Sequence, residues 1–142
     1  PAIMGEIAER ARELGALLRV AHGETLIEPV EPGTNRAALE AGVHILAHPG
    51  LISREEVALA RERGVYLEIS GRPGHSFSNG HVVRLGRELG AALIFNSDAH
   101  APEDLIERRH AHLLIQGSGL SEEESELVLK NSQILLDSLN VP

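Results

Sequence analysis

Apolar residues follow two patterns along the chain, one typical of amphipathic helices and one typical of short buried strands. Helical spacing begins close to the start, where Ile3, Ile7 and Leu14 recur at intervals of a helical turn. Short unbroken apolar runs are instead typical of strands buried on both faces of a parallel sheet. Four such runs predict strands over residues 17–21, 43–47, 65–69 and 92–96.

Start and stop signals predict helices before, between and after these strands. Ser53 and Ser121 each precede a glutamate by three residues, which is the pattern of a capping box. Gly64 and Gly90 stand where helix C-termini are expected, and Pro102 suits a first helical turn. The expected helices span residues 2–14, a short segment capped by Thr34 or Asn35 that ends near Gly42, residues 54–63, a segment from Ser78 or Asn79 to Gly90, residues 102–116, and residues 122–139.

The alternation of helix and strand predicts an α/β fold with parallel strands and crossover helices. The 142 residues suffice for one domain, and no linker divides them. Apolar residues make up 42% of the chain but aromatic residues only 2%, so Leu, Val, Ile and Ala must build the core. Pro1 is not preceded by an initiator methionine, and we interpret the sequence as part of a longer protein.

Composition excludes several kinds of site. The chain has no cysteine, which rules out disulfides and thiolate metal sites and fits a cytoplasmic location. No apolar run approaches the roughly 20 residues of a membrane span, so we expect no membrane partner. The net charge of −8 argues against nucleic acid as a partner. The net charge does not exclude a small phosphorylated substrate, because bound metal ions invert the local charge.

Residue types that bind metals follow all four expected strands. In parallel α/β folds the carboxyl ends of the strands form the functional face. In an extended backbone Asp98 and His100 would point to the same side, although a turn aspartate beside a surface histidine is the alternative. The four strand ends together predict a divalent-metal site, with candidates His22, Glu24, His48, Glu68, His75, Asp98 and His100.

Three segments resemble the PHP (polymerase and histidinol phosphatase) superfamily, and most closely its small stand-alone, histidinol-phosphatase-related members. They are residues 47–50 (Ala-His-Pro-Gly), residues 68–76 and residues 96–100 (Asn-Ser-Asp-Ala-His). The resemblance implies a distorted (βα)7 TIM-like barrel, of which residues 1–142 would be a single partial domain, the C-terminal portion without its N-terminal strand-helix units. It also implies two to three divalent metal ions (zinc, manganese or iron). The implied metal ligands are Glu24 as a bridging carboxylate, His48, His75, Asp98 and His100.

The chain departs from the family at its start, because the opening His-x-His strand has no counterpart. His110 and His112 have the same spacing, but they lie in an expected helix, where residues two apart face nearly opposite ways, and we expect both on the surface. His22 is either a ligand or a neighbour of one. Arg72 either binds a substrate phosphate or is a solvated loop residue. Three further residues are expected to be structural or to line the barrel: His44, His81 and Glu68.

The predicted function is that of a metal-dependent phosphoesterase, a phosphatase or phosphodiesterase that uses metal-activated water on a small phosphorylated substrate. Glu24, Asp98 and His100 would form the catalytic centre and Arg72 would bind substrate. The alternative is a metal-binding but catalytically incomplete fragment or a non-catalytic module. Amidohydrolase chemistry is disfavoured because no lysine stands near a strand end. Exposed strand edges of a partial barrel favour association, so a homo-oligomer is also expected.

Overall fold

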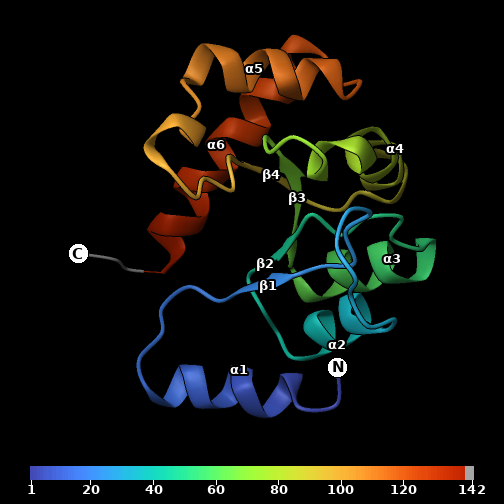
Figure 1. Cartoon of the computed structure of the whole chain (residues 1–142), viewed down its shortest axis with the longest axis vertical. Coiled ribbons are helices and arrows are strands. Elements are labelled where there is room, and N and C mark those ends of the chain that lie inside the picture. Colours follow the sequence, from blue (N-terminus) through green and yellow to red (C-terminus); the bar gives the residue numbers. More distant parts are fainter. Residues whose placement is uncertain (140–142) are drawn as a thin grey trace.

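A computed structural model of the chain describes residues 1–139. Its centre is one parallel sheet with the strand order β1-β2-β3-β4, flanked by helices (Figure 1). The predicted α/β class with four parallel strands is therefore confirmed, while the described residues neither show nor exclude closure into a barrel. The strands are β1 (Val20–His22), β2 (Ile45–Ala47), β3 (Tyr66–Ser70) and β4 (Leu93–Asn96).

Helices connect the strands and continue beyond β4. Helix α1 lies at one end of the molecule, and α5 and α6 lie at the other (Figure 1). Helix α6 packs beside the last strand, where Asn131 Nδ2 donates a hydrogen bond of 2.7 Å to the carbonyl of Leu93. The helices are α1 (Met4–Glu13), α2 (Thr34–Glu40), α3 (Arg54–Arg63), α4 (Asn79–Leu89), α5 (Arg108–Gly117) and α6 (Glu122–Ser138), with 3-10 turns η1 (His75–Ser78) and η2 (Pro102–Asp104).

The two predicted capping boxes are present. Ser53 and Ser121 accept hydrogen bonds from the amides of Glu56 and Glu124, whose carboxylates bond back to the serine amides. Gly64 ends α3 with a φ of +67°, a left-handed conformation that glycine adopts without steric cost. These local signals explain why both ends of α3 and the start of α6 agree with the sequence.

The predicted starts of β1 and α5 and the predicted cap of α2 were wrong. Strand β1 begins three residues late, because Leu17 and Leu18 are exposed and take no part in the sheet. Helix α5 begins at Arg108 rather than Pro102, because Pro102 starts only the turn η2 and the backbone of Leu105 is extended. Helix α2 is capped by neither Thr34 nor Asn35; its capping position is Gly33.

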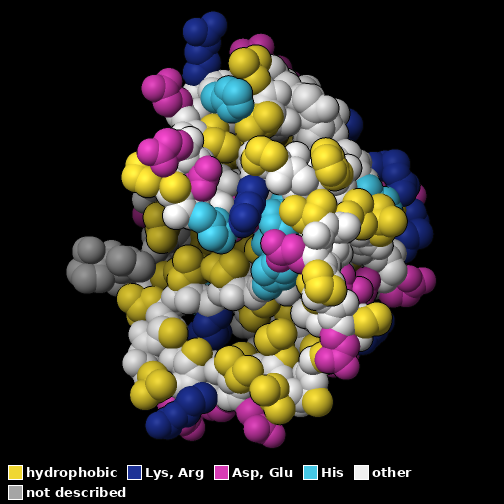
Figure 2. Space-filling view, viewed as in Figure 1, with side chains coloured by type: hydrophobic (Ala, Val, Ile, Leu, Met, Phe, Trp, Pro, Cys, Tyr) yellow, Lys and Arg dark blue, Asp and Glu magenta, His cyan; other side chains and the backbone are white. Residues whose placement is uncertain are grey.

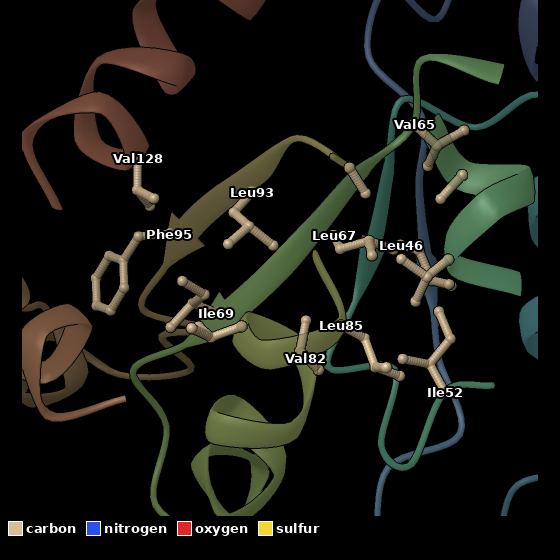
Figure 3. Close-up of a cluster of buried hydrophobic side chains, with 14 of the residues drawn as sticks. Leu46, Ile52, Val65, Leu67, Ile69, Val82, Leu85, Leu93, Phe95 and Val128 are labelled. Carbon is tan, nitrogen blue, oxygen red and sulfur yellow. The ribbon is translucent and has the colours of Figure 1, made fainter. Parts of the chain in front are cut away.

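Strand side chains divide between the two faces of the sheet. On one face Leu46, Leu67 and Ile69 are fully buried against residues of α3 and α4 (Figure 3). Because side chains alternate along a strand, Glu68 and Ser70 point to the opposite face. A smaller apolar cluster, formed by Ile45, Ile94 and Leu135, also lies apart from the main core. Glu68 is thereby placed among buried groups at the carboxyl end of the sheet.

Residues 1–139 contain no helix that combines the length and the apolar character required to cross a bilayer.

Candidate metal centre

The loops after β2, β3 and β4 bring His48, His75 and Asp98 together. One ligand atom from each residue lies within 4.8 Å of the others. The His48 and His75 rings stack with centroids 4.1 Å apart, and His75 Nε2 lies 3.6 Å from Asp98 Oδ2. Both histidines are buried, and the aspartate side chain is 24% exposed. Two imidazole nitrogens and a carboxylate oxygen form a donor set that suits a divalent metal ion.

Unusual backbone conformations shape these loops. His48 and Asp98 have φ values of +30° and +52°, a region that non-glycine residues seldom occupy. Such conformations persist where the surrounding structure enforces them, and they occur often at functional sites. Gly50 follows with a φ of +61°, and an added Cβ there would lie 1.8 Å from the carbonyl oxygen of Glu24. The loop after β2 thus packs directly against the loop after β1.

The electrostatics of His48 favour a metal-binding state. Burial, together with the neighbouring His75 and His22, lowers the pKa of His48 to about 4. Burial also lowers the pKa of His75. Both imidazoles are therefore neutral near pH 7, which is the form that ligates metals. The Nδ1 atom of His48 is buried without a hydrogen-bond partner, and a coordinated cation would satisfy it.

Glu68 is buried next to the three-residue group and fixes the backbone of His48. Its Oε2 accepts a hydrogen bond of 2.5 Å from the amide of His48. Burial, with a smaller contribution from the negative charge of Asp98, raises the pKa of Glu68 to about 7. Glu68 therefore fixes the position of the His48 amide, in addition to lining the interior.

The side chains of Asp98 and His100 both approach Arg72 Nη1, but not through the extended backbone on which the prediction rested. That prediction assumed extended backbone, whereas the left-handed conformation of Asp98 turns the chain after β4. His100 is exposed and lies outside the three-residue group; its Nδ1 is 2.9 Å from the carbonyl of Asp98. Its assignment as a metal ligand stays a prediction.

Arg72 lies over the open side of the group. Its Nη1 is 3.2 Å from Asp98 Oδ2 and 3.0 Å from His100 Nδ1. Figure 2 shows histidine side chains gathered near the middle of one face, with basic and acidic side chains among them. The guanidinium is 34% exposed, so it can meet an anion that approaches from solvent.

Glu24, which was predicted to bridge two metals, lies at the N-terminus of α2. Its Oε1 accepts hydrogen bonds from the amides of Gly33 and Asn35, at 2.9 and 3.0 Å. These amides have no partner within the helix, and an acidic group there stabilises it. Glu24 lies outside the three-residue group, and its role as a ligand stays a prediction.

The end of β1 and the loop after it add three side chains to the centre. The His22 ring lies 4.2 Å from that of His48, and His22 Nε2 lies 3.0 Å from Glu28 Oε2. Glu28 Oε1 lies 3.8 Å from His75 Nε2, and Thr25 Oγ1 is 2.6 Å from His75 Nδ1. The sequence pointed to His22 but not to Glu28, because a carboxylate within a predicted loop has no distinguishing spacing.

The remaining histidines have structural or surface positions. His44 Nδ1 accepts a hydrogen bond from the amide of Arg19, and His81 Nε2 lies 2.8 Å from the carbonyl of Ile52, as expected of structural residues. His110 is exposed, which agrees with the prediction. His112 is only 18% exposed and lies 3.3 Å from Glu126 of α6, so its expected surface position was wrong.

The chain is similar in sequence to an uncharacterized protein and to two proteins named probable phosphatase. It is 42% identical over 130 residues to an uncharacterized protein of Methanocaldococcus jannaschii, covering 91% of this chain and 60% of that protein. It is 30% identical over 132 residues to proteins named probable phosphatase from Aeromonas hydrophila and Aeromonas salmonicida, covering 79% of this chain and 53% of each. The chain thus spans between half and two-thirds of these relatives. No family model matches the sequence.

One solved structure has a closely similar fold. A chain in the cryo-EM structure of archaeal ribonuclease P with mature tRNA superimposes with a TM-score of 0.76 over 95% of this chain and 64% of that one. The sequence identity is 14%, so this similarity concerns the fold alone. It agrees with the parallel α/β arrangement described above.

Proposed function

We propose that the chain is a metal-dependent phosphoesterase centre of the PHP type, acting on a small phosphorylated substrate. The observation that carries this proposal is the convergence of His48, His75 and Asp98 at the carboxyl ends of three parallel strands. Relatives named probable phosphatase support phosphoester hydrolysis as the reaction. Zinc, manganese and iron all accept this nitrogen and oxygen donor set, so each is a candidate cofactor.

The residues of the group fit a cation in charge and protonation. Two neutral imidazoles and one carboxylate supply lone pairs, and the buried Nδ1 of His48 has no other partner. The cation would supply Lewis acidity and a bound water of lowered pKa. Glu68 holds the His48 backbone so that this ligand does not move during the reaction.

Arg72 has the position and charge required to bind the substrate. A guanidinium binds phosphoryl oxygens through paired N–H groups, and this one lies beside the proposed ligand Asp98. His100 contacts the same Nη1 atom and would orient the guanidinium. A phosphoryl group held by Arg72 would lie directly against the metal centre.

The PHP resemblance also leads us to propose that this chain forms the C-terminal portion of a distorted (βα)7 barrel. Four neighbouring parallel strands in sequential order support this arrangement. The Methanocaldococcus relative extends well beyond the matched region, since the chain covers 60% of it. The activity of the longer protein is therefore also part of this proposal.

The proposal is tested by loading the 142-residue chain with Zn²⁺, Mn²⁺ or Fe²⁺ and assaying a panel of phosphomonoesters and phosphodiesters. We expect hydrolysis that is abolished by chelation and by Asp98→Asn, while the exposed Glu31→Gln variant retains it. Metal binding without hydrolysis would favour the alternative of a catalytically incomplete module, which the partial coverage of the relatives also favours. Hydrolysis that survives Asp98→Asn would contradict the proposal.

A further inference from the structure

Each of the four loops at the carboxyl ends of the strands exposes at least one large apolar side chain. These residues are between 44% and 76% exposed: Leu26 and Ile27 after β1, Leu51 after β2, Phe77 after β3 and Leu105 after β4. Figure 2 shows hydrophobic side chains around the histidines on this face of the molecule. Apolar surface grouped beside a few polar residues is typical of sites for small ligands. The edge of the sheet that has the candidate metal centre is therefore also rich in exposed apolar surface.

Two isoleucines pack against the segment that contains Arg72. A Cβ added to Gly74 would lie 2.8 Å from Ile27 Cδ1, and a Cβ added to Gly71 would overlap the side chain of Ile106. Because these glycines have no side chain, the isoleucines can lie directly on the backbone before and after Arg72. Apolar side chains from the loops after β1 and β4 thus flank the segment that presents the guanidinium.

Ile27 is held beside the candidate metal centre by its neighbours on both loops. Glu28, the next residue, has its Oε1 3.8 Å from His75 Nε2, and Gly74, against which Ile27 packs, immediately precedes His75. Thr25 Oγ1 lies 2.6 Å from His75 Nδ1 and fixes the same loop. The Ile27 side chain is only half-buried, so it presents apolar surface to a molecule that enters the centre from solvent.

Several polar side chains of these loops are already engaged within the chain. Asn79 accepts a hydrogen bond from the amide of Ser70 and donates one to its carbonyl, at 3.0 and 2.8 Å. Asp104 accepts hydrogen bonds of 2.9 and 3.0 Å from two backbone amides of the loop after β4. Glu28 Oε2 lies 3.0 Å from His22 Nε2. A hydroxyl group of a ligand would have to displace such contacts, whereas the exposed apolar side chains can be covered without breaking any.

We propose that the centre selects phosphomonoesters whose organic group is apolar, an alkyl or aryl group, and that Ile27 is a specificity-determining residue. The inference rests on the proposed phosphoesterase function and names its substrate class. Arg72 would hold the phosphoryl group against the metal centre, and the organic group would extend toward solvent along Ile27. Each methylene group buried there exchanges water for apolar contact, which strengthens binding by about two- to fourfold.

The test is the affinity of the Zn²⁺-loaded chain for n-alkylphosphonates, measured by calorimetric titration. These compounds share one head group and are not hydrolysed, so the readout does not depend on turnover. We expect butylphosphonate to bind about tenfold or more tightly than methylphosphonate, because it adds three methylene groups. 4-Hydroxybutylphosphonate should bind more weakly than butylphosphonate, because its hydroxyl group loses water without gaining a hydrogen-bond partner.

Variants of Ile27 show whether this residue causes the preference. Ile27→Ser should lower the ratio of butylphosphonate to methylphosphonate affinity toward one, and Ile27→Val should lower it partly. Ile134→Ser is the matched control, because this isoleucine of α6 is 42% exposed and lies outside the four loops. It should keep the ratio of the unaltered chain, and circular dichroism verifies that each variant is folded.

The possible results separate this inference from the proposed function. Equal affinities for methylphosphonate and butylphosphonate in the unaltered chain would overturn the apolar substrate class and leave the proposed metal centre unaffected. A ratio that Ile27→Ser does not lower, or that Ile134→Ser lowers equally, would overturn the role of Ile27. A Zn²⁺-loaded chain that binds none of the phosphonates would overturn the proposed function as well.

Discussion

Arg72 Nη1 lies 3.2 Å from Asp98 Oδ2, and the same carboxylate oxygen lies 3.6 Å from His75 Nε2. Asp98 is thus shared between a guanidinium and the candidate metal centre. A cation bound to Asp98 would compete with Arg72 for this oxygen and would repel its charge. The guanidinium would then be available to an incoming anion, which links metal binding to substrate binding.

Replacing Arg72 with alanine should have opposite effects on the two ligands. Loss of a partly exposed ion pair removes about 0.2–1 kcal/mol, so we expect Zn²⁺ to bind up to about fivefold more tightly. Loss of a charge-assisted hydrogen bond of about 1.5–3 kcal/mol should weaken binding of inorganic phosphate to the Zn²⁺-loaded chain by about tenfold or more. Calorimetric titration measures both affinities.

Arg72→Lys is the matched control, because it keeps the charge and loses the paired donors. It should leave the Zn²⁺ affinity close to that of the unaltered chain and weaken phosphate binding less than alanine does. Unchanged phosphate affinity in Arg72→Ala would show that this residue is a solvated loop arginine.

Glu68 should give the fold a stability that decreases as pH rises. In the unfolded chain this carboxyl ionises near its ordinary pKa of 4.5, whereas burial keeps it protonated to a pKa of about 7 in the fold. The folded state therefore binds more protons between these values, and about 3 kcal/mol of stability is lost across the window. Glu68→Gln lacks this titration, so its stability relative to the unaltered chain should rise by about that amount from pH 4.5 to pH 7.

Urea unfolding at several pH values, in the presence of a chelator, measures this difference. Glutamine keeps an oxygen that can accept from the His48 amide, so the variant is expected to fold. A stability difference that stays constant with pH would mean that the pKa of Glu68 in the fold is not raised above its value in the unfolded chain.

Much of the fold followed from local sequence signals. The apolar runs predicted the four parallel strands, and the capping boxes at Ser53 and Ser121 fixed the starts of α3 and α6. The failures arose where a tertiary contact decided the outcome. Helix α2 is capped by Glu24, which lies nine residues before Gly33, and no local pattern reveals such a distant cap.

The site was predictable in residue type but not in geometry. Parallel topology brings strand ends to one edge, so His48, His75 and Asp98 could be grouped from the sequence. His100 could not be placed, because the left-handed φ of Asp98 has no sequence signature beyond the general tolerance of aspartate for it. Glu28 could not be found, since its position depends on how the loop after β1 folds over His75.

The structure predicts that Glu24 acts on stability rather than on metal content. Glu24→Ala removes the acceptor for two amides at the N-terminus of α2, which should cost about 1 kcal/mol in the free energy of unfolding. Glu31→Ala, whose side chain is 76% exposed, should cost less than about 0.5 kcal/mol. Denaturant unfolding of both variants gives these values.

Metal titration of the same two variants separates a cap from a ligand. Both should bind as many Mn²⁺ ions as the unaltered chain. Loss of one equivalent in Glu24→Ala alone would support the bridging role that the family resemblance implies for Glu24.

The most direct measurement is anomalous X-ray diffraction from crystals of the 142-residue chain soaked in Zn²⁺, with data collected on both sides of the zinc absorption edge. We predict an anomalous peak about 2.0–2.2 Å from a nitrogen of His48, a nitrogen of His75 and an oxygen of Asp98. Crystals of Asp98→Ala should lose this peak. Zinc that appears only at surface histidines such as His110, with no peak among the three residues, would contradict the metal centre.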